Sequence, residues 1–156
     1  MIAVVQRVSK ASVKVEEPPH LETIKQGLCI LLGVEEGDTN EQAKWMAGKL
    51  ARLRIFADEQ GKMNRSVQDI NGEILLVSQF TLAGDCTKGN RPSFAKAAAG
   101  ELGKSLYETV GQYLQADHGL PVKYGVFGAM MNVSIDNDGP VTLIVRKEPN
   151  GIVRNV

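Results

Sequence analysis

Two short segments hold the residues that could carry out chemistry in this chain. The first, Ser78–Leu82, follows an apolar run, and the second, Asn137–Thr142, lies near the C-terminus. Neither segment supplies an obvious base or metal ligand. Main-chain N–H groups at a strand end can stabilise charge that develops on an ester carbonyl, and a Gly-Pro loop can present carbonyl oxygens. The sequence therefore predicts a site that depends on main-chain geometry rather than on titrating side chains.

The first segment also has a purely structural interpretation. Polar Ser78 and Gln79 come directly after four apolar residues, so their side chains could simply cap loose backbone groups where a strand ends. Thr81 is the nearest candidate nucleophile, but the sequence places no base beside it. Both interpretations stay open at this point.

The Gly139-Pro140 pair likewise allows two interpretations. An Asn-Asp-Gly-Pro turn between strands is common, and about one X-Pro bond in twenty is cis in folded proteins. A cis bond here would hold the Gly139 and Pro140 carbonyls in a fixed orientation, where they could accept hydrogen bonds from a substrate ammonium. Such a rigid wall of backbone could reject one enantiomer by steric clash, whatever its side chain.

Several enzyme classes are disfavoured by what the chain lacks. Its two histidines, His20 and His118, lie far apart and outside any ligand-spaced group of cysteines or carboxylates. There is no Gly-x-Ser-x-Gly nucleophile elbow and no Walker motif, and Gly125-x-x-Gly128 is too weak a signal for dinucleotide binding. We therefore expect neither a metal nor another cofactor.

The composition is that of an ordinary globular protein. With 156 residues, 43% of them hydrophobic and 23% charged, the chain fits one domain. No apolar run is long enough for a membrane span or a signal peptide, and two cysteines do not suggest a disulfide framework, so we expect a cytoplasmic protein. Basic and acidic residues balance at 18 each, so the whole molecule has no general attraction for nucleic acid. Basic residues nevertheless gather in two stretches, Lys44–Arg65 and Lys88–Lys104.

The hydrophobic pattern predicts an α+β fold, a single domain with a mostly antiparallel β-sheet or β-barrel-like core and two main flanking helices. Strands are expected over residues 2–8, 11–15, 27–34, 74–77, 131–136 and 141–145, with 137–140 as the loop between the last two. The capping box Thr39-Asn40-Glu41-Gln42 predicts the start of one helix. The other is expected over about residues 100–116, with an inner stripe of Leu102, Leu106, Val110, Tyr113 and Leu114.

Taken together, these segments resemble the D-aminoacyl-tRNA deacylases, formerly called D-tyrosyl-tRNA deacylases. The similarity covers nearly the whole chain, and six matches in the right order are a far stronger signal than single tripeptides. The matching segments are Val5-Gln6-Arg7-Val8 with Ala11-Ser12-Val13, Leu31-Leu32-Gly33-Val34 with Leu53-Arg54-Ile55-Phe56, Ser78-Gln79-Phe80-Thr81-Leu82, Lys88-Gly89-Asn90-Arg91-Pro92-Ser93-Phe94, Phe127-Gly128-Ala129 and Asn137-Asp138-Gly139-Pro140-Val141-Thr142.

The resemblance implies a homodimer that hydrolyses the ester between a D-amino acid and the 3′-terminal adenosine of tRNA. Glycine mischarged onto tRNA is a further implied substrate, because glycine has no side chain to be sorted by chirality. The family is described as working without a protein base, with the terminal ribose 2′-hydroxyl assisting the attacking water. The basic stretches would then contact tRNA phosphates, and neither DNA nor a membrane is an expected partner.

The resemblance also assigns roles to individual residues. Gly139-Pro140 would be a cis motif that enters the partner subunit's pocket, holds the α-ammonium and excludes L-amino acids, and Arg7 would brace that loop. Phe127 and Met131 would shape the pocket for the terminal adenosine. The ester site itself would be lined by Ser78, Gln79, Phe80 and Thr81, with N–H groups near Phe80 as oxyanion donors.

Two parts of the chain depart from the family pattern. Residues 16–20, Glu-Glu-Pro-Pro-His, replace an expected glycine-bearing hairpin turn, and about residues 147–156 form a C-terminal extension of the single 1–156 domain. Two other functions remain as alternatives. One is a non-catalytic RNA-binding homodimer of the same fold, and the other is a general small-ester hydrolase, which would need a conventionally activated nucleophile.

Overall fold

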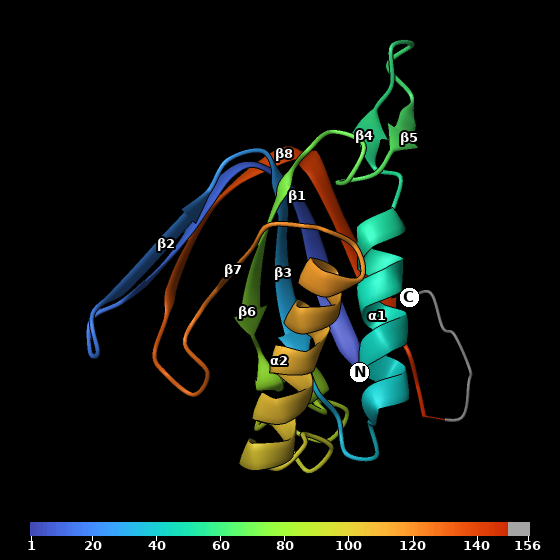
Figure 1. Cartoon of the computed structure of the whole chain (residues 1–156). Helices are drawn as coiled ribbons and strands as arrows, with labels where there is room; N and C mark the ends of the chain where they lie inside the picture. The colour runs from blue at the N-terminus through green and yellow to red at the C-terminus, as the bar shows by residue number, and fades with distance from the viewer. Residues whose placement is uncertain (150–156) are drawn as a thin grey trace.

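The computed structural model describes residues 1–149 (Figure 1). Its strands are β1 Ile2–Val15, β2 His20–Ile24, β3 Gly27–Gly33, β4 Phe56–Ala57, β5 Met63–Arg65, β6 Glu73–Ser78, β7 Val122–Tyr124 and β8 Asn132–Arg146. Its helices are α1 Asn40–Arg52, the short 3₁₀ helix η1 Phe80–Ala83 and α2 Gly100–Ala116. Within residues 1–149, none of the helices combines the length and the apolar character needed to cross a bilayer.

Strand β1 organises the main sheet because it pairs with three other strands. Along one edge its residues 2–8 pair with β3 and its residues 11–15 pair with β2, so β8 must occupy the other edge. These pairings are antiparallel, whereas β3–β6 and β6–β7 are parallel. The strand order is β2-β1-β3-β6-β7, with β8 beside β1. The predicted α+β fold, with a barrel-like sheet and two flanking helices, is confirmed (Figure 1).

Both faces of the central strands are buried, which explains their continuous apolar runs. Alternate residues of β3 and β6, such as Leu28 and Leu76, belong to the larger core, which also contains the inner faces of α1 and α2. The residues between them, such as Cys29 and Leu75, belong to a second cluster on the opposite face. Met131 is one of the partly buried residues that pack against this second cluster.

The strand boundaries differ from the sequence-based predictions in three ways. The two strands expected before residue 16 form the single strand β1, in which irregular pairing with β8 on either side of Val8 accommodates the exposed Ser9 and Lys10. The two strands expected after residue 130 likewise form the single strand β8, so residues 137–140 are a distorted part of one strand and not a connecting loop. The short strands β2 and β7 were not predicted, because five and three residues are too few for a clear periodicity.

Helix α1 begins at the capping box that the sequence predicts. At the start of α1 the Thr39 hydroxyl accepts from the Glu41 N–H at 3.3 Å, and the Gln42 side chain accepts from the Thr39 N–H at 2.9 Å. Helix α2 has the expected bounds. Leu102, however, is wrongly placed on its inner stripe, because 43% of that side chain is exposed one turn from the helix start.

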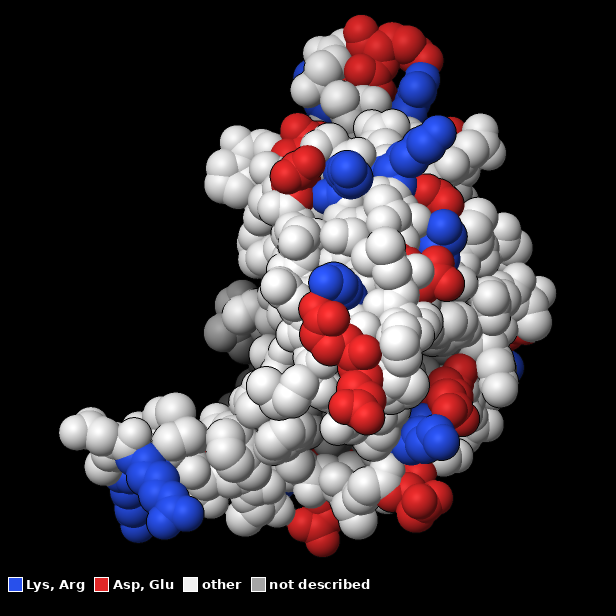
Figure 2. Space-filling view, turned by 90° about the vertical axis from the view of Figure 1, so that its left-hand side faces the viewer, with Lys and Arg blue, Asp and Glu red and all other residues white. Residues whose placement is uncertain are grey.

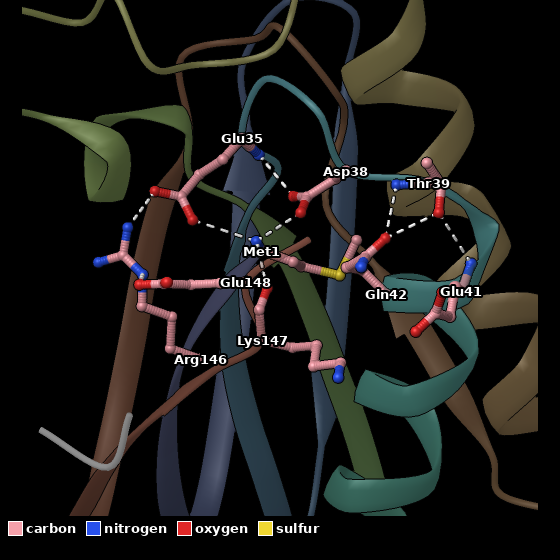
Figure 3. A network of polar contacts seen from close by, with 9 residues as sticks. All are labelled: Met1, Glu35, Asp38, Thr39, Glu41, Gln42, Arg146, Lys147 and Glu148. Carbon is pink, nitrogen blue, oxygen red and sulfur yellow. Dashed lines mark hydrogen bonds and ion pairs between the residues drawn. The ribbon is translucent and has the colours of Figure 1, made fainter. Parts of the chain in front are cut away.

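The chain's first residue is fixed by a buried network of charges (Figure 3). The α-ammonium of Met1, wholly shielded from solvent, donates to Asp38 Oδ1 at 2.7 Å, to Glu35 Oε2 at 3.1 Å and to the Lys147 carbonyl at 3.0 Å. Arg146 pairs with the other oxygen of Glu35. Burial raises the pKa of Asp38, although the hydrogen bond from the ammonium opposes that rise. Lys147 thus packs against the domain, while residues 150–156 of the predicted extension lie outside the described residues.

Candidate active site

The first predicted segment lines a pocket at the end of β6. The pocket has a volume of about 390 Å³. It brings together six of the nine predicted site residues, Ser78, Gln79, Phe80, Thr81, Phe127 and Met131. The remaining walls come from the chain on either side of these residues, namely Val77, Gly128, Ala129, Met130 and Val133.

The backbone changes direction within this segment. The Gln79 N–H donates to the Leu32 carbonyl at 2.8 Å, which ends the pairing of β6 with β3. The Leu82 N–H then bonds to the Gln79 carbonyl at 3.3 Å as the first hydrogen bond of η1. The N–H groups of Phe80 and Thr81 precede that bond, so they have no partner inside the helix. These are the main-chain donors that the sequence predicts at the strand end.

The pocket is open and its mouth is apolar. The Phe80 side chain is 58% exposed and the Met130 side chain is 93% exposed. Phe80 is held from one side by Phe94, whose ring meets it edge-to-face with 5.2 Å between centroids. Phe127 contacts the buried ring of Tyr107, with 5.9 Å between centroids. Exposed aromatic and thioether groups of this kind suit a flat, partly apolar ligand such as a nucleobase.

Acid–base side chains are missing from the walls of this pocket. Among its eleven lining residues there is no histidine, carboxylate, lysine, cysteine or tyrosine. The polar side chains are Ser78, Gln79 and Thr81, and the Gln79 amide donates to the Thr81 hydroxyl at 2.5 Å. Elsewhere in residues 1–149, His20 Nε2 lies 2.8 Å from the Tyr124 carbonyl oxygen. Over the same residues no three histidine, cysteine or carboxylate groups are clustered so as to hold a metal ion.

The second predicted segment lies elsewhere on the chain, within β8. The Gly139–Pro140 peptide bond is cis, and Gly139 has a φ of +124° that disfavours any residue with a side chain. A Cβ atom at this position would also lie 3.1 Å from Arg7 Nη2. The Arg7 guanidinium donates from Nε to the Asp138 carbonyl at 3.2 Å, and from Nη1 to the Ile55 carbonyl at 2.6 Å. Arg7 therefore contacts the Gly-Pro segment.

A single chain does not bring the two segments together. Ser78 pairs with Leu32, which pairs with Ala3, whereas the Gly-Pro segment lies beside Arg7, four residues further along β1. Val133 of β8 lines the pocket, whereas Gly139 lies six residues further along the same strand, about 20 Å at the usual rise per residue. Gly139, Pro140 and Arg7 accordingly do not line the pocket of their own chain.

Comparison with known proteins identifies the family. The family described as D-Tyr-tRNA(Tyr) deacylase matches residues 4–146. This chain belongs to the D-Tyr-tRNA(Tyr) deacylase family. The D-aminoacyl-tRNA deacylase of Thermotoga petrophila is 54% identical over 93% of this chain and 96% of its own length. That of Halalkalibacterium halodurans is 51% identical over 95% of this chain and 100% of its own length.

A solved structure in the same fold is that of a protein named c-Myc DNA Unwinding Element Binding Protein. It superposes on this member of the deacylase family with a TM-score of 0.87 and 42% sequence identity. The match covers 95% of this chain and 99% of the solved one. The family assignment and the barrel-like fold thus agree with each other.

Five of the residues that line the pocket were not predicted. Met130 directly precedes the predicted Met131, and Val133 follows Met131 at the two-residue spacing of a strand face. That alternation was visible in the sequence and could have identified Val133. Gly128 and Ala129 carry little side chain, so no residue pattern marks them as pocket walls.

Proposed function

We propose that this chain hydrolyses the ester that joins a D-amino acid to the 3′-terminal adenosine of tRNA, releasing free tRNA and the amino acid. The observation that carries the proposal is the pocket at the end of β6, which has main-chain donors and polar side chains but no acid–base side chain. Relatives about half identical to this chain over nearly their whole length bear the name D-aminoacyl-tRNA deacylase. Cytoplasmic action follows, because that is where charged tRNA is used.

In the proposed reaction, water attacks the ester carbonyl and the bond to the ribose 3′-oxygen breaks. The negative charge that develops on the carbonyl oxygen is stabilised by N–H groups at Phe80 and Thr81. The attacking water loses its proton with the help of the substrate's own 2′-hydroxyl, and the 3′-oxygen of the ribose takes up a proton as it leaves. Thr81 positions water or substrate, and its hydroxyl is already engaged by Gln79.

We further propose that the protein is a homodimer in which each pocket is completed by the partner's Gly139-Pro140. The separation of the two segments within one chain supports this arrangement, because neither segment can act on the other's ligand in a monomer. The paired carbonyls would hold the substrate ammonium and exclude an L side chain by contact. Glycine has no side chain that would clash with these carbonyls, so glycyl-tRNA is a second proposed substrate.

Mixed dimers test this proposal. Ala129→Trp fills the pocket of its own chain, and Gly139→Val disrupts the Gly-Pro segment of its own chain, so each homodimer should be inactive on D-tyrosyl-tRNA. Unfolding and random reassociation of equal amounts should restore about a quarter of wild-type activity, because half of the dimers then hold one intact site. If the mixture is no more active than either parent, the two segments do not work across subunits.

The alternative function is RNA binding without hydrolysis, and hydrolysis assays on D- and L-esters of tRNA distinguish it from the proposal. A non-catalytic homodimer would bind uncharged tRNA and leave both D- and L-esters intact. DNA is not a proposed partner, although the name of the solved relative refers to DNA binding by that protein. Duplex DNA should therefore fail to compete with tRNA in a hydrolysis assay.

A further inference from the structure

A short hairpin projects from the rim of the candidate active site. The Asp85 and Ser93 backbones exchange two hydrogen bonds, of 2.8 and 2.9 Å, and so close a loop. The Asp85 carboxylate accepts from the Thr87 N–H at 2.9 Å and from the Thr87 hydroxyl at 2.7 Å, which stiffens the outgoing side. Every residue from 86 to 94 is exposed. We call residues 85–93 the arm.

The arm is fastened to the pocket through its neighbour Phe94. That ring packs edge-to-face on Phe80, a residue of the pocket wall, with 5.2 Å between centroids. Gly84 makes room for the contact, since a Cβ atom there would lie 2.9 Å from the Phe94 ring. Arg91 is three residues from Phe94, so the two Cα atoms are at most about 11 Å apart. The tip of the arm is therefore held close to the mouth of the pocket.

Beyond Asp85 at its base, the charged side chains of the arm are all basic. Residues 86–92 contain two cations, Lys88 and Arg91, and no carboxylate. Over residues 1–149 neither cation takes part in an ion pair with another side chain. Figure 2 shows acidic and basic side chains interspersed over most of one face of the molecule. The end of the projection at the lower left of that view carries basic side chains alone. An anionic partner is therefore expected at the arm.

We propose that the arm binds backbone phosphates of the single-stranded 3′ end of tRNA, those of the nucleotides that lead to the terminal adenosine. This inference rests on the proposed function. Once the ester is in the pocket, these phosphates are the anions of the substrate nearest to Phe80. The guanidinium of Arg91 offers a fork of donors to a phosphate, and Lys88 adds a point charge. The arm increases the affinity for tRNA and takes no part in bond breaking.

Two substrates distinguish this role from a role in the chemistry. D-tyrosyl-tRNA carries the phosphates, whereas the 3′-D-tyrosyl ester of adenosine has none. The double variant Lys88→Ala/Arg91→Ala should lose roughly tenfold to a hundredfold in kcat/KM on the tRNA and keep its rate on the adenosine ester. Its plot of log(kcat/KM) against log[salt] on tRNA should be shallower by about 1.4, since each contact with a single-strand phosphate contributes about 0.7.

A matched control removes the same charge elsewhere. Lys14 and Lys25 are exposed lysines at the ends of β1 and β2, and Lys14→Ala/Lys25→Ala should leave both substrates and the salt slope unchanged. A second readout needs no variant of the arm. Cys86 is exposed within it, so uncharged tRNA should slow modification of Cys86 in the wild-type protein, and inorganic phosphate at the same phosphate concentration should not.

Three results would overturn the proposal. Equal losses on both substrates would mean that the arm shapes the pocket, and no loss on either would mean that it binds nothing in the reaction. Loss on full tRNA but not on a D-tyrosyl ester of the trinucleotide CCA would place the contact on the acceptor stem. Failure of the proposed function looks different, because the wild-type protein would then hydrolyse neither D-ester.

Discussion

Arg7 and Asp138 join the two longest strands of the sheet directly beside the Gly139-Pro140 bond. The Arg7 Nε atom lies 3.2 Å from the Asp138 carbonyl oxygen and also 3.2 Å from a carboxylate oxygen of the same residue. Its Nη1 atom holds the Ile55 carbonyl at 2.6 Å. Only a planar, forked cation can serve these acceptors at once, so the contact fixes the Gly-Pro segment of β8 relative to β1 and to the chain at Ile55.

Replacing Arg7 by lysine should therefore cost activity although the charge is kept. A lysine ammonium cannot reach both acceptors, and hydrogen bonds to charged groups contribute about 1.5–3 kcal/mol, so kcat/KM on D-tyrosyl-tRNA should fall roughly tenfold to a hundredfold. Arg65→Lys, on the short strand β5, is the matched control and should have little effect. Unchanged kcat/KM and D/L selectivity in Arg7→Lys would show that Arg7 does not position the segment.

The network at the N-terminus predicts a loss of stability on changing Asp38 to asparagine. The substitution removes a carboxylate from a fully buried ammonium and leaves Glu35 as its one anionic partner among residues 1–149. We expect the free energy of unfolding to fall by about 3–5 kcal/mol, as measured by urea denaturation at pH 7. Asp117→Asn, at the exposed end of α2, should change it by less than about 0.5 kcal/mol.

The pH dependence of that loss has a definite sign. Burial raises the pKa of Asp38 in the folded protein, so the folded state keeps a proton that the unfolded state has already released. This residue's contribution to stability therefore declines as pH rises from its unfolded pKa to its folded pKa. The wild-type protein should show this decline relative to Asp38→Asn. A difference between the two that grows with rising pH in this window would contradict the account.

The two cysteines should differ sharply in reactivity. Cys29 is buried in β3, and burial raises the pKa of its thiol to about 12, whereas Cys86 is exposed on the arm. Because the thiolate is the reactive form, a disulfide reagent at pH 8 should modify one thiol per native chain and two after denaturation. Cys86→Ser should abolish the rapid reaction. Rapid modification of two thiols in the native protein would mean that Cys29 is accessible.

The histidines should be dispensable for catalysis. Neither His20 nor His118 lines the pocket, and loss of a true general base would cost roughly a hundredfold to ten-thousandfold. His20→Gln and His118→Gln should keep kcat on D-tyrosyl-tRNA within about threefold of wild type, as measured in single-turnover assays. A drop of a hundredfold in either variant would assign a general base that the pocket geometry does not contain.

Features set by short stretches of sequence were predictable. The capping box at Thr39 and the spacing of apolar residues fix α1 and α2, because a helix is stabilised largely within itself and along one face. The burial of β3 and β6 followed from their continuous apolar runs. The position of Ser78–Thr81 at the end of β6 was predictable for a similar reason, since polar residues directly after such a run mark the end of a strand.

Features set by pairing between distant strands were not predictable. Strand β1 continues through Ser9 and Lys10 by irregular pairing with the neighbouring strand β8. No local sequence pattern indicates that β8 is the neighbour. The same holds for residues 137–140, which look like a loop in the sequence but lie within β8. That Gly139-Pro140 is far from Ser78 in one chain likewise depends on strand order, which is why the proposed site requires a second subunit.

The central claim is tested most directly by the release of amino acid from D-tyrosyl-tRNA and L-tyrosyl-tRNA in matched reactions that contain a metal chelator. The account predicts rapid loss of the D-ester and persistence of the L-ester, since a main-chain site with a Gly-Pro wall needs no metal and admits one hand of the substrate. Loss of both esters at similar rates, or of neither, would contradict it.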